Sequence, residues 1–126
     1  MRAEYLVASR ELCQELYAVA GDKVETYFCW MHSHEGWAWN IGTSKHVERT
    51  ADMITVPAYD SVVLQSMLPQ FYATKRLSND AYFVCPQGLD PDKYPCSATD
   101  KNVCNALIRV VIDLLKEGIV KAEDLG

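Results

Sequence analysis

The clearest pattern along the chain is the recurrence of apolar residues three and four positions apart, which predicts helices with one buried face. The first such segment lies between Ser9, a typical N-cap residue, and Gly21, a typical helix end. Its apolar positions are Leu12, Cys13, Leu16, Tyr17, Val19 and Ala20. We therefore expect a helix between Ser9 and Gly21.

The strongest helical pattern comes near the end of the chain, in residues 101–118. Its apolar stripe consists of Val103, Ala106, Leu107, Val110, Val111 and Leu114. Thr99 or Asp100 is expected to cap this helix, because either side chain can accept a hydrogen bond from an early backbone N–H group. Gly118 is expected to end it.

Residues 24–33 and 37–42 are rich in aromatic and β-branched residues and predict two strands. Glu35 and Gly36 between them predict a two-residue hairpin loop. This loop sets three cross-strand pairs, which are Trp30 with Ile41, His32 with Trp39, and His34 with Trp37. Because strand side chains alternate, these six residues share one face, and Cys29 and Met31 lie on the other.

The middle of the chain predicts a short helix and a second hairpin. The helix is expected between Pro57 and Pro69, and the apolar residues suited to its buried side are Tyr59, Val62, Val63, Met67 and Leu68. The hairpin is expected from strands at residues 71–77 and 81–85, with the polar residues 78–80 as its turn.

The order of elements is therefore helix, hairpin, helix, hairpin, helix, with polar connections at 42–53 and 86–100. The acidic tail, about residues 119–126, is expected to fray. A hairpin alone is marginally stable, so we expect the two hairpins to share one four-stranded antiparallel sheet. About three helices then cover one face of this sheet, which gives an α+β architecture in a single domain over residues 1–126.

Charge and cysteine content narrow the possible functions. The net charge of −5, from 12 basic and 17 acidic residues, argues against a general nucleic-acid binder, which needs a basic surface. No stretch approaches the roughly 18 consecutive apolar residues of a membrane span, and the apolar run near the start is too short for a signal peptide. The five cysteines are odd in number and irregularly spaced, as is typical of free thiols in a reducing compartment. We expect a cytoplasmic protein.

Five pieces of the chain follow a familiar order: RELCQELY, YFCWMHSHEGWAW, VPAYDSVVLQSML, FYATKRLSNDAYFV and NALIRVVIDLLKEG. Together they cover most of residues 9–118. This order resembles small uncharacterised proteins encoded by bacteriophages, prophages and other mobile elements. The resemblance carries no catalytic residue. It implies a cytoplasmic protein with an accessory role.

The candidate metal site is the pair His32 and His34, which lie two positions apart on one strand face. A catalytic zinc site needs three protein ligands and a structural one needs four. The third ligand would come from His46, or from Glu48 or a cysteine (Cys85 or Cys96). No second metal-binding motif supports this interpretation. A ladder of cross-strand aromatic pairs accounts for the same residues, and the sequence favours it.

The cysteines are the candidate nucleophiles. Cys96 lies in a polar loop and is expected to be the most exposed thiol, whereas Cys104 is expected to be buried in the last helix. Cys29 lies on the strand face opposite the two histidines. No base and orienting group accompanies any of these thiols, so the sequence assigns no catalytic residue and favours a non-enzymatic protein.

An interaction surface is the remaining candidate. Helices on one face of a sheet leave the other face open, and an exposed apolar face usually marks a partner. The candidate interaction residues are Tyr27, Trp30, Met31, Trp37 and Trp39. We therefore expect protein–protein contact or self-association. The sequence does not separate this function from a third one, that of an inhibitor or adaptor of a nucleic-acid process. The alternative is a zinc-binding protein that uses His32 and His34 with a third ligand. The sequence leaves a small-molecule ligand open.

Overall fold

The structure, a computed structural model, describes residues 7–21, 24, 26–33, 40–43, 53–69, 72–77, 80–87, 96–121 and 123. These residues form an α+β fold of three helices and two antiparallel sheets of three strands each. The helices are α1 (Arg10–Ala20), α2 (Ser61–Met67) and α3 (Val103–Lys116). The strands are β1 (Phe28–Ser33), β2 (Asn40–Thr43), β3 (Met53–Ala58), β4 (Tyr72–Arg76), β5 (Tyr82–Pro86) and β6 (Ala98–Asp100).

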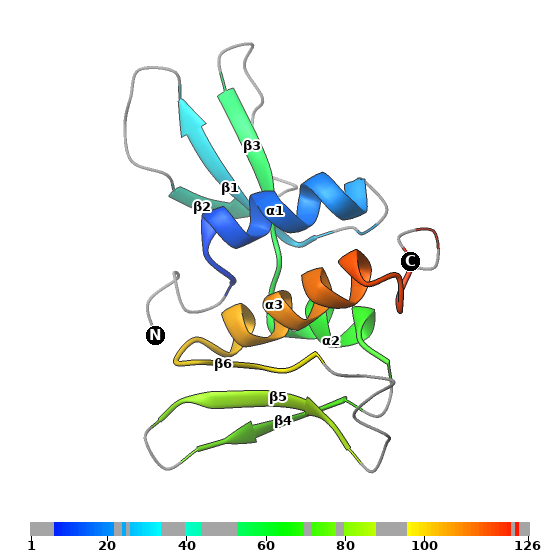
Figure 1. The fold of residues 1–126 in the computed structure, drawn as a ribbon. Coiled ribbons are helices and arrows are strands. Elements are labelled where there is room, and N and C mark those ends of the chain that lie inside the picture. The colour runs from blue at the N-terminus through cyan, green and yellow to red at the C-terminus, as the bar shows by residue number, and fades with distance from the viewer. Residues whose placement is uncertain are drawn as a thin grey trace.

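The helices lie between the two sheets (Figure 1). The first sheet has the strand order β2-β1-β3, and the second has the order β4-β5-β6. Helix α1 contacts β3 on one side and α3 on the other. Helix α3 in turn contacts α2 and the strands β5 and β6. The core therefore lies in the helical layer and on the inner faces of both sheets.

The single four-stranded sheet expected from the sequence is not what the structure shows. Residues 53–58, which were not predicted as a strand, form β3 and pair with β1. Residues 98–100, expected to belong to a loop, form β6 and pair with β5. Each hairpin thus gains a third strand from an adjoining segment instead of joining the other hairpin. The helices also pack against both sheets and not against one face of a common sheet.

The reason is the burial of α3. Besides the predicted stripe, Ile108 and Ile112 are buried, and so is Cys104 on a further side of the helix. A helix that is apolar on most of its sides must be covered on most of its sides. One sheet covers only one side of a helix, so β5 and β6 cover one side of α3, α1 and α2 cover others, and β3 in turn covers α1.

The first hairpin has the predicted register where it is described. Trp30 pairs with Ile41, as expected, and Met31 pairs with Asn40. The other two predicted pairs involve residues 34–39, which lie outside the described residues. Trp30 is half-buried, packs against the core, and its indole Nε1 donates a hydrogen bond to the carbonyl oxygen of Ala8 at 3.2 Å. The second hairpin is confirmed as β4 and β5.

The first helix has the predicted ends, because the Ser9 side chain accepts from the N–H of Leu12 and Gly21 follows the helix with a φ of 66°. In α2 the N-cap is Asp60, and Val62 is 74% exposed, so the expectation that Val62 is buried was wrong. Leu64, which the prediction omitted, is buried in its place.

The predicted N-cap of α3 was wrong, because residues 98–100 are in a strand and the helix begins later. Asn102 is the cap, and its Oδ1 accepts a hydrogen bond from the N–H of Cys104 at 2.9 Å. The predicted end is confirmed at Gly118, which has a φ of 73°. The chain does not fray immediately after it, since Ile119 and Val120 pack against the core.

Two asparagines of α3 attach the segment that precedes α1. The Nδ2 of Asn102 donates to the carbonyl oxygen of Val7 at 3.2 Å. The Oδ1 of Asn105 accepts from the N–H of Ser9 at 2.7 Å. On its other side this segment pairs with the start of α2, where the N–H of Ala8 donates to the carbonyl oxygen of Tyr59 at 2.9 Å. The entry into α1 is thus fixed by residues distant in sequence.

We predict that Asn102→Ala lowers the free energy of unfolding by about 2 kcal/mol, because it removes the cap of α3 and leaves the Val7 carbonyl without its side-chain donor. Urea denaturation followed by circular dichroism measures this change. Lys101→Ala, at the exposed neighbouring position, is the control and is expected to change stability by less than about 0.5 kcal/mol. An equal loss in both variants would contradict the assigned role of Asn102.

Candidate functional site: a groove on helix α3

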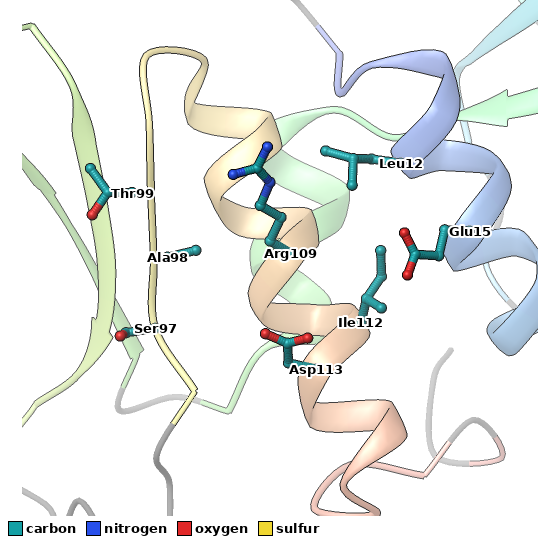
Figure 2. A pocket seen from close by; sticks show the side chains of 8 residues that line it. All are labelled: Leu12, Glu15, Ser97, Ala98, Thr99, Arg109, Ile112 and Asp113. Carbon is teal, nitrogen blue, oxygen red and sulfur yellow. The ribbon is translucent and has the colours of Figure 1, made fainter.

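One side of α3 is not covered by either sheet. Within the apolar run of this helix, Arg109 and Asp113 are the exposed positions, and they lie one turn apart. A groove with a volume of about 390 Å³ lies over them, between α1 and β6 (Figure 2). We call it the α3 groove. Its lining residues are Leu12, Glu15, Ser97, Ala98, Thr99, Arg109, Ile112 and Asp113.

The floor of the α3 groove is apolar. Ile112 is buried, and Leu12 and Ala98 are half-buried and pack against the core. In Figure 2 Ala98 points toward α3, whereas the side chains of Ser97 and Thr99 point to the other side of β6. The pairing agrees with this view, because Ala98 lies opposite the fully buried Val84 of β5. The two hydroxyl groups therefore do not point into the groove.

The rim of the groove is charged. A nitrogen of the half-exposed Arg109 lies 3.4 Å from a carboxylate oxygen of Asp100. The Nζ of Lys116 lies 2.7 Å from a carboxylate oxygen of Glu15 and joins α3 to α1. These ion pairs are exposed to solvent, so each contributes little to stability. They matter for binding because they neutralise the rim cations Arg109 and Lys116.

Cys96, expected to be the most exposed thiol, is in fact buried, with 8% of its surface accessible. It lies two residues before β6 and packs in the core cluster, because part of the loop that was expected there forms this strand. Its pKa is raised, first by burial and then by the carboxylates of Asp113 and Glu117. A raised pKa leaves little thiolate at neutral pH, so Cys96 is a poor nucleophile.

The other thiols are buried as well. Cys104 is buried, as expected, and burial raises the pKa of both Cys104 and Cys13 to about 11. Cys29 and Cys85 are buried too, and none of the five cysteines forms a disulfide. This environment is typical of structural cysteines that pack as small apolar residues. Nothing in these positions supports nucleophilic catalysis.

The structure does not bring the described candidate interaction residues together on one face. Tyr27 is 58% exposed at the start of β1 and stacks edge-on against Phe28. Trp30 faces the core, while Met31, one residue later, lies on the opposite face of β1. Trp37 and Trp39 lie outside the described residues, so their part of the prediction stays a prediction.

Most residues of the predicted metal site also lie outside the described part of the chain. His32 lies in β1, where it pairs with Ile54 of β3, whereas His34 and His46 are not described. Among the residues that are described, no group of three or more His, Cys, Asp or Glu side chains is placed to hold a metal ion.

The α3 groove was not predicted from the sequence. The available signal was the pair Arg109 and Asp113, which interrupts an otherwise apolar helix. Its meaning depends on Ala98 and Leu12, which come from distant segments and could not be placed beside α3 beforehand.

Comparisons with protein-family models, with curated proteins and with solved structures gave no match. None of the described helices is long and apolar enough to cross a membrane.

We predict that stability falls as the pH rises from 9 to 11. Burial raises the pKa of Cys13 and Cys104 from the ordinary thiol value of 9.0 to about 11 in the folded protein, so between these pH values the unfolded chain binds fewer protons than the folded one. The loss is on the order of 2 kcal/mol per thiol. Urea denaturation at pH 8, 9, 10 and 11 measures it.

The double variant Cys13→Ala/Cys104→Ala is the comparison for this experiment, because it removes both thiols and keeps the other titrating groups. We expect it to lose less stability than the natural sequence over the same pH interval. Parallel curves for the two proteins would show that these thiols do not cause the decrease.

Proposed function

We propose that this protein is non-enzymatic and acts through protein–protein contact, with the α3 groove as its docking surface. The observation that carries the proposal is an apolar floor of Leu12, Ala98 and Ile112 beneath a charged rim. An apolar centre with a polar rim is the usual composition of a protein interface. The groove is open to solvent along α3, so it suits side chains presented by a partner better than a small molecule that must be enclosed.

The described lining residues of the groove include no histidine or cysteine. Their titratable groups are two carboxylates and one guanidinium, and the guanidinium and one carboxylate already have ion-pair partners. General acid–base or nucleophilic catalysis needs a group whose pKa is tuned for the reaction and whose partner orients it. The groove offers a surface for binding and no such pair.

Association through the sheet edges is less favoured than association through the groove. In the described part of the chain, the edge strands are β2, β3, β4 and β6, of which β3 and β4 are the longest. Pro57 lies in β3 and cannot donate to a further strand, and β4 ends with the exposed Lys75 and Arg76. Proline and charged residues on edge strands are common devices that prevent edge-to-edge pairing. A partner is therefore expected to bind a groove or a face.

We place the protein in the cytoplasm and connect it with phages or mobile elements. Both statements are parts of the proposal and rest on the order of the sequence segments described above. An accessory protein of that kind commonly works by binding another protein as an inhibitor or adaptor. The groove provides a surface for such an activity. The alternative of a zinc protein built on His32, His34 and His46 has no observation in its favour among the described residues.

We predict that peptides selected from a displayed random library on the purified protein bind in the α3 groove. Leu12→Gln removes apolar floor and is expected to weaken the selected peptides about fivefold or more, which fluorescence anisotropy measures. Val19→Gln is the matched control, because Val19 is an exposed apolar residue on the same helix outside the groove. Circular dichroism establishes that both variants fold.

Two results would refute the groove as the docking surface. One is peptide affinity that Leu12→Gln leaves unchanged in the folded variant. The other is a selection that enriches no peptide over an unrelated protein.

We further predict that native mass spectrometry of the untagged, reduced protein shows a metal-free species. A zinc-sized mass that disappears in the double variant His32→Ala/His34→Ala would replace the docking proposal with the metal alternative. The same spectrum gives the oligomeric state, and a stable dimer that survives Leu12→Gln would assign self-association to another surface.

A further inference from the structure

The charges around the α3 groove do not balance. Four carboxylates lie on or next to its rim, and two of them are used by the ion pairs of Arg109 with Asp100 and of Lys116 with Glu15. The remaining two are Asp113, which lines the groove, and Glu117, one turn further along. Both are exposed, and across the described part of the chain neither makes an ion pair with a cation.

The position of Asp113 and Glu117 makes this excess negative charge stronger. Both lie at the C-terminal end of α3, where the helix dipole already contributes partial negative charge. They are also four residues apart, so their like charges repel one another along the helix surface. A cation that binds beside Asp113 and Glu117 would reduce both the unfavourable interaction with the helix dipole and the repulsion between the two carboxylates. A C-terminal helix turn usually carries basic residues, and here Lys116 is engaged by Glu15 of α1.

The negative charges of Asp113 and Glu117 also act on the Cys96 thiol. Their electrostatic effect contributes to the raised pKa of Cys96, which lies two residues before β6. Asp113 lines the groove together with Ala98 of β6 (Figure 2), and Glu117 lies one helical turn further along. An apolar floor and an unneutralised negative end thus lie next to each other.

We propose that the α3 groove binds a basic segment of a partner protein, with an arginine or lysine at Asp113 and an adjacent apolar side chain over Leu12 and Ile112. This proposal rests on the proposed function and specifies the chemistry of the partner. A long basic side chain fits because its aliphatic stem covers apolar surface while its charged end reaches a carboxylate. Arginine also matches a carboxylate with two parallel hydrogen bonds.

Charge argues against a second copy of this chain as the occupant. The protein has a net charge of −5, so two copies repel one another, while a basic partner is attracted from a distance. Arg109 at the other end of the groove fixes the direction of the bound segment, because a basic residue is disfavoured beside it.

The test uses the full chain labelled with ¹⁵N and two matched probes, N-acetyl-leucyl-arginine amide and N-acetyl-leucyl-citrulline amide. Citrulline keeps the shape of arginine and removes its charge. We expect the arginine probe to shift the amide signals of residues 97–99 and 109–113, with an affinity about threefold or more above that of citrulline, as expected for an exposed ion pair. The preference is expected to shrink as salt is raised.

Asp113→Asn removes the charge and keeps the size of the side chain, and it is expected to abolish the preference for arginine. Asp80→Asn is the matched control, because Asp80 is an exposed aspartate at the turn between β4 and β5 and lies outside the groove. Asp80 has a φ of 61°, a conformation that asparagine also accepts, so the control variant is expected to fold and to keep the preference.

The possible results separate the proposal of a basic segment from the more general proposal that the groove is a docking surface. Equal binding of both probes in the groove would overturn the basic anchor and leave the groove as a docking surface. Shifts elsewhere, or no shifts with either probe, would overturn both. A preference for arginine that persists in Asp113→Asn would place the cation at a different group and refute the assigned contact.

Discussion

The structure depends on the burial of α3. Eight of its fourteen residues are buried, and they lie on several sides of the helix. No single layer can cover such a helix, because a sheet or a helix shields only the side that it contacts. The chain therefore places α1 and α2 beside α3, packs β5 and β6 against it, and lets β3 cover α1 from the other direction. The arrangement of two sheets around a helical layer follows from this requirement.

The same requirement explains how the ends of the chain are joined. Because α3 lies in the middle of the molecule, its N-terminus is close to other segments. The polar side chains there can form hydrogen bonds with these segments. Asn102 caps α3 and also binds the carbonyl oxygen of Val7, while Asn105 receives the N–H of Ser9. Asp100 accepts from the N–H of Asn102 and contacts Arg109, which attaches β6 to the same region. Polar side chains here stabilise packing that the apolar face alone would leave loosely oriented.

Local features of the fold could be predicted from the sequence, and the assembly of the sheets could not. The ends of α1 at Ser9 and Gly21, and the pairing of Trp30 with Ile41, follow from cap and turn chemistry that acts over a few residues. The third strand of each sheet was missed for a different reason. Pro57 in β3 is unusual for a strand, and β6 is only three residues long within a polar, proline-rich stretch. Whether these two segments form strands therefore depends on pairing partners elsewhere in the chain.

The candidate site was hidden for the same reason. Arg109 and Asp113 are ordinary exposed residues of a helix until Ala98 and Leu12 are placed on either side of them (Figure 2). The exposure of Cys96 was wrongly predicted because the residues that follow it form β6 and its own side chain packs in the core cluster. The groove is therefore a product of incomplete cover: α1 and β6 both contact α3 but leave one strip of it between them. Because that strip ends where the helix dipole and two carboxylates coincide, the groove has an apolar floor of Leu12, Ala98 and Ile112 and is negative at one end, which is a combination that a basic protein segment complements.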